Sequence, residues 1–335
     1  MLNFNWRNVL CLKKIQKRIP YFDNVKGLLI TLVVLGHIIE PFLYIHSLDF
    51  IYILIYSFHM PLFIFCSGYF ACKNNKKILH NLIFPYILFQ CLYILFERYI
   101  LHNDVTFTFT TPYWILWYLL SVSSFNIIIQ FFEKINIKVI FISFIIGLAV
   151  GYDNSIGHYL SLSRTISLFP FFLLGYYFRI SRFDFNKLKK NNNIVYISVF
   201  LTFIFTILIY LFCNSIDKNW IFGSNPYEAF NYNFIIRCAS YIVAIILSVF
   251  ILIILPNKNI KFITKAGTNS MSIFLLHGFV IKFLQKYFNF GIFHTNFNII
   301  IAMILITLLV VMIFSSKLIS NSLNNVLSVG IAQHK

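Results

Sequence analysis

Charged side chains are scarce in this sequence, and their scarcity excludes a water-soluble globule. Only 11% of the 335 residues are Asp, Glu, Lys or Arg, whereas 59% are hydrophobic. A soluble domain carries about 25% charged residues because its surface must be hydrated. The chain is therefore expected to fold in a lipid bilayer.

Acidic residues and metal-binding motifs are also few. The chain has 10 Asp and Glu against 27 Lys and Arg, and its 6 cysteines form no CxxC pair. Neither a disulfide framework nor a zinc site is indicated, so we expect no bound metal. The sequence also lacks a GxGxxG loop, a Walker loop and an HExxH motif, so it gives no sign of the soluble-enzyme chemistry that these motifs carry.

Long apolar runs dominate what is present. A membrane-spanning helix needs roughly 20 apolar residues. The runs lie at residues 25–45, 50–71, 79–101, 113–132, 137–151, 162–179, 194–213, 233–255, 268–286 and 296–316. The sequence therefore predicts an all-α integral membrane protein with about ten transmembrane helices.

The basic residues predict the orientation of these helices. Residues 1–20 are basic, and the apolar run that follows is long and has no small-residue cleavage site, so we expect an uncleaved first span and a cytoplasmic N-terminus. Counting alternate loops from there puts roughly 21 of the 27 Lys and Arg inside, as the positive-inside rule requires. We expect a transmembrane domain over 21–317 and a short cytoplasmic tail over 318–335. Topology and contact with membrane lipids then explain the net charge of +17, without nucleic acid.

Ionisable residues inside the expected spans are candidates for function, because burying them in lipid is costly. His37 follows Asp23 by about 21 Å along a helix, which puts it in the outer half of the first span. His59 in the second span is expected at the same depth, and Glu40 lies one turn beyond His37 on the same face. The three residues fit a buried acid/base cluster. Alternatively each histidine is a satisfied polar group that joins helices, which suits His59 because Pro61 disturbs the backbone beside it.

Three further ionisable residues lie in later spans. Arg164 and Arg237 fall near the outer ends of their spans, where long side chains can extend to the interface. The alternative is a bidentate contact with a phosphate or carboxylate of the substrate. His277 fits either a buried structural group or a substrate contact.

Two segments resemble a known family. YFDNVKGLLITLVVLGHIIEP (residues 21–41) and YSFHMPLFIFCSGYF (residues 56–70) are similar to signatures of the membrane acyltransferase-3 family, especially its fucose 4-O-acetylase-like branch. Weaker similarities follow in family order at residues 114–119, 169–178 and 270–279. The family also has ten spans. One position departs from it, because Asn81 stands where members often carry an arginine before Pro85 and Tyr86.

The resemblance implies an O-acyltransferase, expected to be an O-acetyltransferase, in the bacterial cytoplasmic membrane. The donor would be acetyl-CoA on the cytoplasmic side, and the acceptor a sugar hydroxyl of a capsular, exopolysaccharide or lipid-linked glycan. The expected catalytic residues are His37, Glu40, His59 and Asp23. The expected contacts are Lys26, Lys76 and Lys77 with the coenzyme, and Arg164, Arg237 and His277 with the acceptor.

Two questions stay open at the level of sequence. His37 can act as a general base or as a nucleophile that carries the acyl group. A multi-span carrier of a glycan precursor or small anion would use the same buried charges, although carriers often have related halves and none is evident here. A transferase releases free coenzyme A in the presence of acceptor, and a carrier does not. The sequence does not indicate an oligomeric state.

Overall fold

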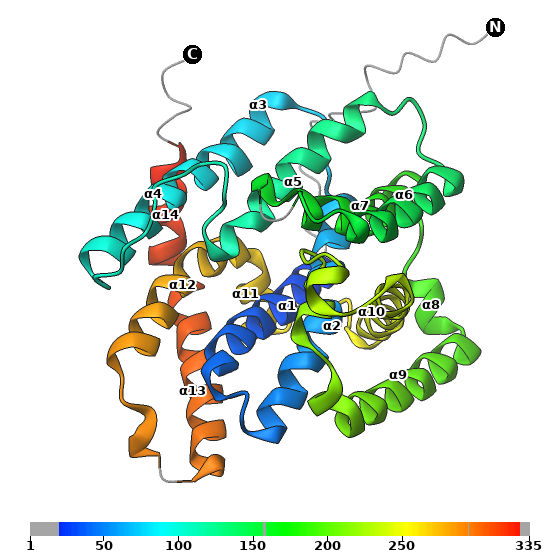
Figure 1. Ribbon diagram of the computed structural model, residues 1–335. Coiled ribbons are helices and arrows are strands. Elements are labelled where there is room, and N and C mark those ends of the chain that lie inside the picture. Colours follow the sequence, from blue (N-terminus) through cyan, green and yellow to red (C-terminus); the bar gives the residue numbers. More distant parts are fainter. Residues whose placement is uncertain (1–19, 157–158, 294, 329–335) are drawn as a thin grey trace, which may run out of the picture.

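The computed structural model describes residues 20–156, 159–293 and 295–328, and every regular element in this part of the chain is a helix (Figure 1). The α-helices are α1 (Pro20–Ile39), α2 (His46–Tyr69), α3 (Asn75–Ile78), α4 (Phe84–Tyr99), α5 (Trp117–Ile128), α6 (Ile137–Ala149), α7 (Leu162–Ile180), α8 (Asn186–Lys190), α9 (Asn192–Phe212), α10 (Phe234–Ile254), α11 (Lys261–Thr268), α12 (Ser270–Tyr287), α13 (Asn296–Phe314) and α14 (Lys317–Ser328). A π-helical turn, Leu79–Ile83, joins α3 to α4. The prediction of an all-helical protein is confirmed.

Seven helical segments are long and apolar enough to cross a membrane, judged by length and composition alone. They are Pro20–Phe42, His46–Tyr69, Asn75–Tyr99, Trp114–Phe131, Asn192–Ser215, Phe234–Ile254 and Asn296–Phe314. The other three expected spans are helical too, as α6, α7 and α12, but they fall outside this set. Seven segments are therefore candidate spans, and the expected number of about ten stays a prediction. Both chain ends, 1–19 and 329–335, lie outside the described residues, so the expected cytoplasmic termini stay predictions.

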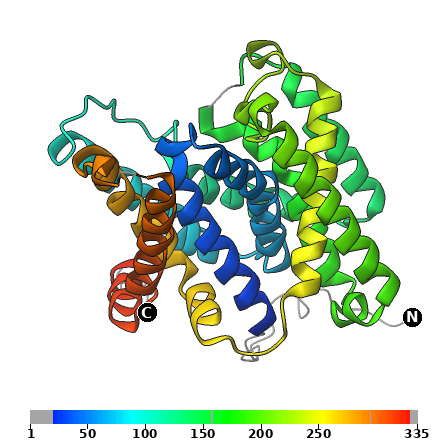
Figure 2. The ribbon, with the colours of Figure 1, turned by 90° about the horizontal axis from the view of Figure 1, so that it is seen from below.

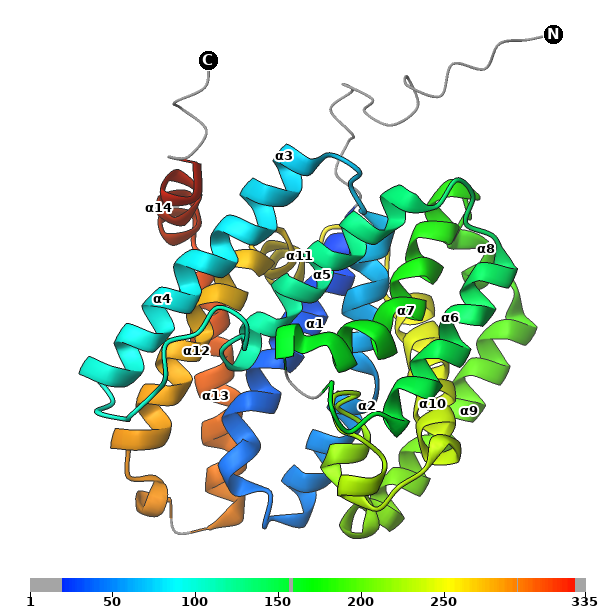
Figure 3. The ribbon, with the colours of Figure 1, turned by 45° about the horizontal axis from the view of Figure 1, so that its top comes forward.

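The hairpin of α1 and α2 occupies the middle of the molecule. α12 and α13 pack on α1, and α7 and α10 pack on α2. Figure 1 and Figure 2 show α12 and α13 on one side of this hairpin and α9 and α10 on the other. Figure 3 shows α5 passing in front of α1 and α4 passing in front of α12. Several polar residues of these two helices, such as Asp23 and His59, are therefore buried inside the bundle, whereas Glu40 at the end of α1 is exposed.

Glycine allows two pairs of helices to touch through their backbones. A Cβ on Gly175 of α7 would lie 1.9 Å from the carbonyl oxygen of Phe65, and one on Gly68 of α2 would lie 1.9 Å from that of Phe172. The crossing of α1 with α11 is built in the same way at Gly27. Small residues give membrane helices this close approach. The crossings hold α1 and α2 against their neighbours along most of the bundle.

Candidate functional site

His37 lies in the last turn of α1, and its imidazole reaches α2. Its Nδ1 is 3.0 Å from the hydroxyl of Tyr56 and 3.9 Å from Oε2 of Glu40, and the side chain is 14% exposed. Gly36 makes room for this contact, since a Cβ there would lie 2.8 Å from the Tyr56 ring. The predicted grouping of His37 with Glu40 is therefore present in the structure.

Two more elements hold the His37 ring. The Trp114 ring centroid is 4.5 Å from that of His37, and the His277 ring stacks on it at 5.7 Å. Gln285 of α12 donates a 3.1 Å hydrogen bond to the His37 carbonyl. The imidazole is thus held between α2, α12 and the turn that begins α5.

His277 is fully buried, and only one of its ring nitrogens has a partner. Nδ1 donates to the carbonyl of Ile273 at 2.8 Å, so the neutral ring has its lone pair on Nε2. No described residue donates a hydrogen bond to Nε2. His277 therefore presents an unused acceptor beside His37.

His59 is less free. Its Nδ1 donates to the carbonyl of Ile55 at 2.8 Å, within α2, and its ring meets Tyr56 edge-on at 4.7 Å. The structure thus brings His37 and His59 to opposite sides of one tyrosine, although it shows no hydrogen bond between them. This geometry agrees with the alternative considered from the sequence, in which His59 is a buried polar group with its own hydrogen-bond partner.

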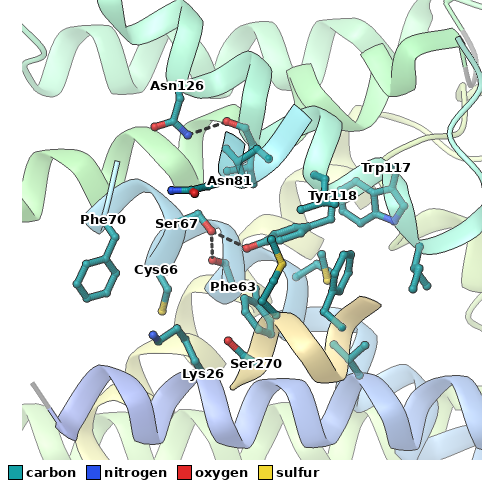
Figure 4. A pocket seen from close by; sticks show the side chains of 18 of the residues that line it. Lys26, Phe63, Cys66, Ser67, Phe70, Asn81, Trp117, Tyr118, Asn126 and Ser270 are labelled. Carbon is teal, nitrogen blue, oxygen red and sulfur yellow. Dashed lines mark hydrogen bonds between the residues drawn. The ribbon is translucent and has the colours of Figure 1, made fainter. Parts of the chain in front are cut away.

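A largely apolar cavity of about 340 Å³ runs between α1, α2, α5 and α12 and has His37 on its wall. Lys26, Phe70 and Lys77 line its other end. Figure 4 shows Phe70 and Lys26 on one side of this space and Trp117 on the other. Lys26 and His37 both belong to α1 and are separated by roughly 16 Å of helix rise. The cavity therefore connects the basic inner end of α1 with the histidine at its outer end.

Few polar groups interrupt the cavity wall. The hydroxyls of Ser67 and Tyr118 are 2.7 Å apart, and Ser67 also donates to the carbonyl of Phe63 at 3.0 Å (Figure 4). Asn126 and Asn81 add amide groups near the inner end of this space. An extended, mostly uncharged chain fits such a lining better than a charged one.

The remaining predicted residues of the inner half lie apart from the histidines. Asp23 pairs with Lys26 at 2.9 Å, and both belong to the inner end of α1. Lys77 lines the cavity, whereas Lys76 is exposed on α3 and does not. The structure thus places Asp23 beside Lys26 near the start of α1, and not with the acid/base cluster.

The two predicted arginines occupy different surroundings. The guanidinium of Arg164, in the first turn of α7, lies over the Trp117 indole at 4.9 Å, and Trp117 lines the cavity that His37 also borders. Arg237 is fully buried away from the cavity and donates hydrogen bonds to the carbonyl oxygens of Gly147 in α6 and of Asn225 in the loop before α10. The structure brings Arg164 to the His37 region, but not Arg237.

Several residues near His37 were not predicted. Tyr56 and Trp114 each begin a family-like segment, at 56–70 and 114–119, so the motifs contained the signal. Gln285 and Lys282 follow His277 on α12, and no sequence pattern marked them. Among residues 20–156, 159–293 and 295–328, no group of three or more His, Cys, Asp or Glu is placed to hold a metal ion.

These features define a class: a helical, multi-pass membrane protein in which His37, paired with Glu40, stands on the wall of a largely apolar cavity. The chain belongs to the acyltransferase-3 family, since the family profile described as an acyltransferase domain matches residues 19–316. It is also 50% identical over 54 residues to nodulation protein NolL of Sinorhizobium fredii (strain NBRC 101917 / NGR234), a match that covers 15% of this chain and 15% of that protein. No solved structure gives a significant match.

Proposed function

We propose that this protein is an O-acetyltransferase of the fucose 4-O-acetylase-like branch that acylates a cell-surface glycan at the bacterial cytoplasmic membrane. The observation that carries the proposal is the cavity that joins Lys26 and Lys77 to His37. A basic entrance suits the phosphates of coenzyme A, and the apolar channel suits its pantetheine arm. The thioester would then reach His37.

The donor site depends on lysines. Lys77 is exposed at the cavity entrance, with Lys76 beside it, while the charge of Lys26 is already balanced by Asp23. Asn81 replaces the arginine that family members often carry, so the phosphates would meet point charges and not a bidentate fork. We therefore expect Lys77 to contribute more to coenzyme binding than Lys26.

The geometry at His37 suits a general base. We assign the ring proton to Nδ1, which donates to the Tyr56 hydroxyl and leaves the lone pair on Nε2. Nε2 removes the proton of the sugar hydroxyl while that oxygen attacks the thioester carbonyl; the C–S bond then breaks, and the leaving thiolate takes the proton from Nε2. Glu40, 3.9 Å from Nδ1, stabilises the imidazolium that forms in between.

His277 and His59 have supporting parts in this proposal. The buried ring of His277 stacks on that of His37 and holds it in position for the incoming hydroxyl. His59 fixes the position of Tyr56 through their edge-on contact. No observation favours the carrier alternative over transfer, and membership of an acyltransferase family favours transfer.

The test uses the native host. Surface polysaccharide from the wild type, from a deletion strain and from a His37→Ala strain is compared by NMR for O-acyl signals. The unacylated polysaccharide of the deletion strain then serves as acceptor for purified protein, with release of free coenzyme A as the readout.

We expect His37→Ala to lower the rate of coenzyme A release by roughly 100- to 10,000-fold, the range for loss of a general base. His102→Asn, which changes an exposed histidine in the loop after α4, should retain the wild-type rate. Unchanged acylation in the deletion strain would refute the function, and a wild-type rate in His37→Ala would refute the mechanism.

A further inference from the structure

The two arginines of the outer half differ in what their guanidinium groups contact. Arg237 donates to the carbonyl oxygens of Gly147 and Asn225, at 3.3 and 2.7 Å, and to the hydroxyl of Tyr232 at 2.5 Å. Arg164 has no hydrogen-bond acceptor and no carboxylate partner in the described part of the chain. Its guanidinium lies over the face of the Trp117 indole at 4.9 Å. Arg237 therefore acts as a structural group, and Arg164 does not.

An unpaired arginine is costly at this position. The guanidinium has five N–H donors, and Arg164 is half-buried inside the bundle. The indole ring attracts the positive charge but accepts none of these hydrogen bonds in the way an oxygen does. Ionisable groups at membrane depth normally pair or serve a substrate. The donors of Arg164 are thus available to an oxyanion.

Arg164 is also close to the reacting groups. Its guanidinium lies over Trp117, and Trp117 lines the same cavity as His37. Lys282 lies over the Trp114 indole at 4.6 Å, and the Trp114 ring is 4.5 Å from that of His37. Lys282 too has no carboxylate partner among the described residues. Each cation thus lies on the face of a tryptophan that belongs to the surroundings of the histidine.

The nearby carboxylates are already engaged. Asp49 pairs with Lys218 at 2.9 Å, and Glu97 accepts hydrogen bonds from Tyr113 and Asn103. Glu40 faces His37. The surroundings of the histidine thus have two unpaired cations and one carboxylate that already has a role.

We propose that the acceptor carries an oxyanion, a carboxylate or a phosphate, next to the hydroxyl that is acylated, and that Arg164 binds it. This rests on the proposed function and narrows its substrate class to acidic glycans. A planar guanidinium contacts two oxygens of a carboxylate or phosphate at once, so Arg164 orients the sugar as well as attracting it. Lys282 adds a second positive charge.

The experiment measures binding without transfer. Purified protein in neutral phosphatidylcholine nanodiscs is first saturated with coenzyme A, so that the donor lysines are occupied. Binding of methyl glucuronide, glucose 1-phosphate and neutral methyl glucoside is then followed by tryptophan fluorescence at constant ionic strength. A repeat in nanodiscs containing phosphatidylglycerol tests whether an anionic lipid headgroup supplies the oxyanion instead.

We expect at least one anionic sugar to bind roughly 10- to 100-fold more tightly than methyl glucoside, the range for a hydrogen bond to a charged group. Arg164→Gln should remove this difference and leave the affinity for methyl glucoside unchanged, and Arg164→Lys should restore part of it. Arg98→Gln removes an exposed cation of α4 and should preserve the full difference.

Three results would overturn the proposal: no preference for an anionic sugar in the wild type, equal weakening of anionic and neutral sugars by Arg164→Gln, or loss of the preference only when phosphatidylglycerol is present. The last result would assign Arg164 to a lipid headgroup. Failure of the proposed acyl transfer would appear separately, as absence of coenzyme A release with the unacylated polysaccharide.

Discussion

Tyr56 connects the two histidines of the central hairpin. Its hydroxyl meets Nδ1 of His37, and its ring packs edge-on against His59 and stacks on Tyr52 at 4.0 Å. In the proposed mechanism this contact keeps the ring proton of His37 on Nδ1 and leaves Nε2 free to act. The ring of Tyr56 thus contributes to packing, and its hydroxyl contributes to the protonation of His37.

Replacing Tyr56 by Phe keeps the ring and removes the hydroxyl. We expect kcat to fall by roughly 10- to 100-fold, because a hydrogen bond to a group that becomes charged is lost, while KM for acetyl-CoA stays unchanged. Steady-state kinetics of coenzyme A release measure both values. Tyr44→Phe, which removes an exposed hydroxyl, is the matched control. An unchanged kcat in Tyr56→Phe would show that the tautomer of His37 is set in another way.

Sequence reasoning reached some of these side chains and not others. His37 and Glu40 were predictable because one helix turn separates them and because a histidine in an apolar run is rare. Tyr56 begins the family-like segment 56–70 but was not singled out, since 19% of the residues are aromatic and the motif does not show which ring meets His37. Arg164 and Arg237 look alike in sequence, because the loop carbonyl oxygens that pair with Arg237 are brought to it only by folding.

At the scale of helices, the crossing of α2 with α7 is the contact most sensitive to volume. Phe65 and Gly68 on α2 meet Phe172 and Gly175 on α7 through backbone atoms, and Cys66 and Ser67 of the cavity wall belong to the same turn of α2. A shift of this crossing would therefore change the shape of the donor cavity.

Gly175→Ala tests this contact. The added methyl would lie 1.9 Å from the Phe65 carbonyl oxygen, a backbone atom that cannot rotate away. We expect the free energy of unfolding to fall by about 1–3 kcal/mol or more, as in overpacked cores, with a matching loss of apparent Tm in detergent. Ala239→Val adds a larger volume on the exposed face of α10 and should leave Tm almost unchanged. Equal Tm values for the two variants would contradict the described crossing.

Most helix positions followed from apolar length, but two features did not. The run 162–179 became α7 (Leu162–Ile180), close to its predicted limits. Residues after 317, predicted as a tail, form α14 (Lys317–Ser328). This helix was not predicted because its many Asn and Ser residues separate the apolar residues that would indicate a helix. The glycine crossings could not be predicted, because a glycine in an apolar run does not show which helix it faces.

For the whole molecule, the distribution of charge predicts the orientation that the proposed reaction needs. The basic entrance of the cavity must face the cytoplasm for coenzyme A to reach it. The same assignment puts the loop between α4 and α5, which follows Tyr99, on the outer side. The opposite orientation in the membrane would therefore also rule out the proposed mechanism.

Labelling of single cysteines measures this orientation. In a background with the native cysteines replaced, Thr106→Cys in the α4–α5 loop and Lys76→Cys on α3 are treated with a membrane-impermeant maleimide; both positions are exposed. We expect Thr106→Cys to react in intact cells and Lys76→Cys only after permeabilisation. The reverse pattern would invert the topology and remove the cytoplasmic donor from the proposed function.

The backbone contact of α1 with α11 at Gly27 has a consequence for the choice of acyl chain. It lies one residue from Lys26, on the helix that also carries His37, so the basic entrance and the reacting end belong to one rigid rod. If coenzyme A is held by its phosphates at that entrance, its reach to His37 is fixed, and each extra carbon of a longer acyl group must extend beyond the histidine into the space of the acceptor. The length of α1 between Lys26 and His37 would then limit the length of the acyl group. Selection of a short acyl group would be a property of the helix scaffold more than of any single side chain.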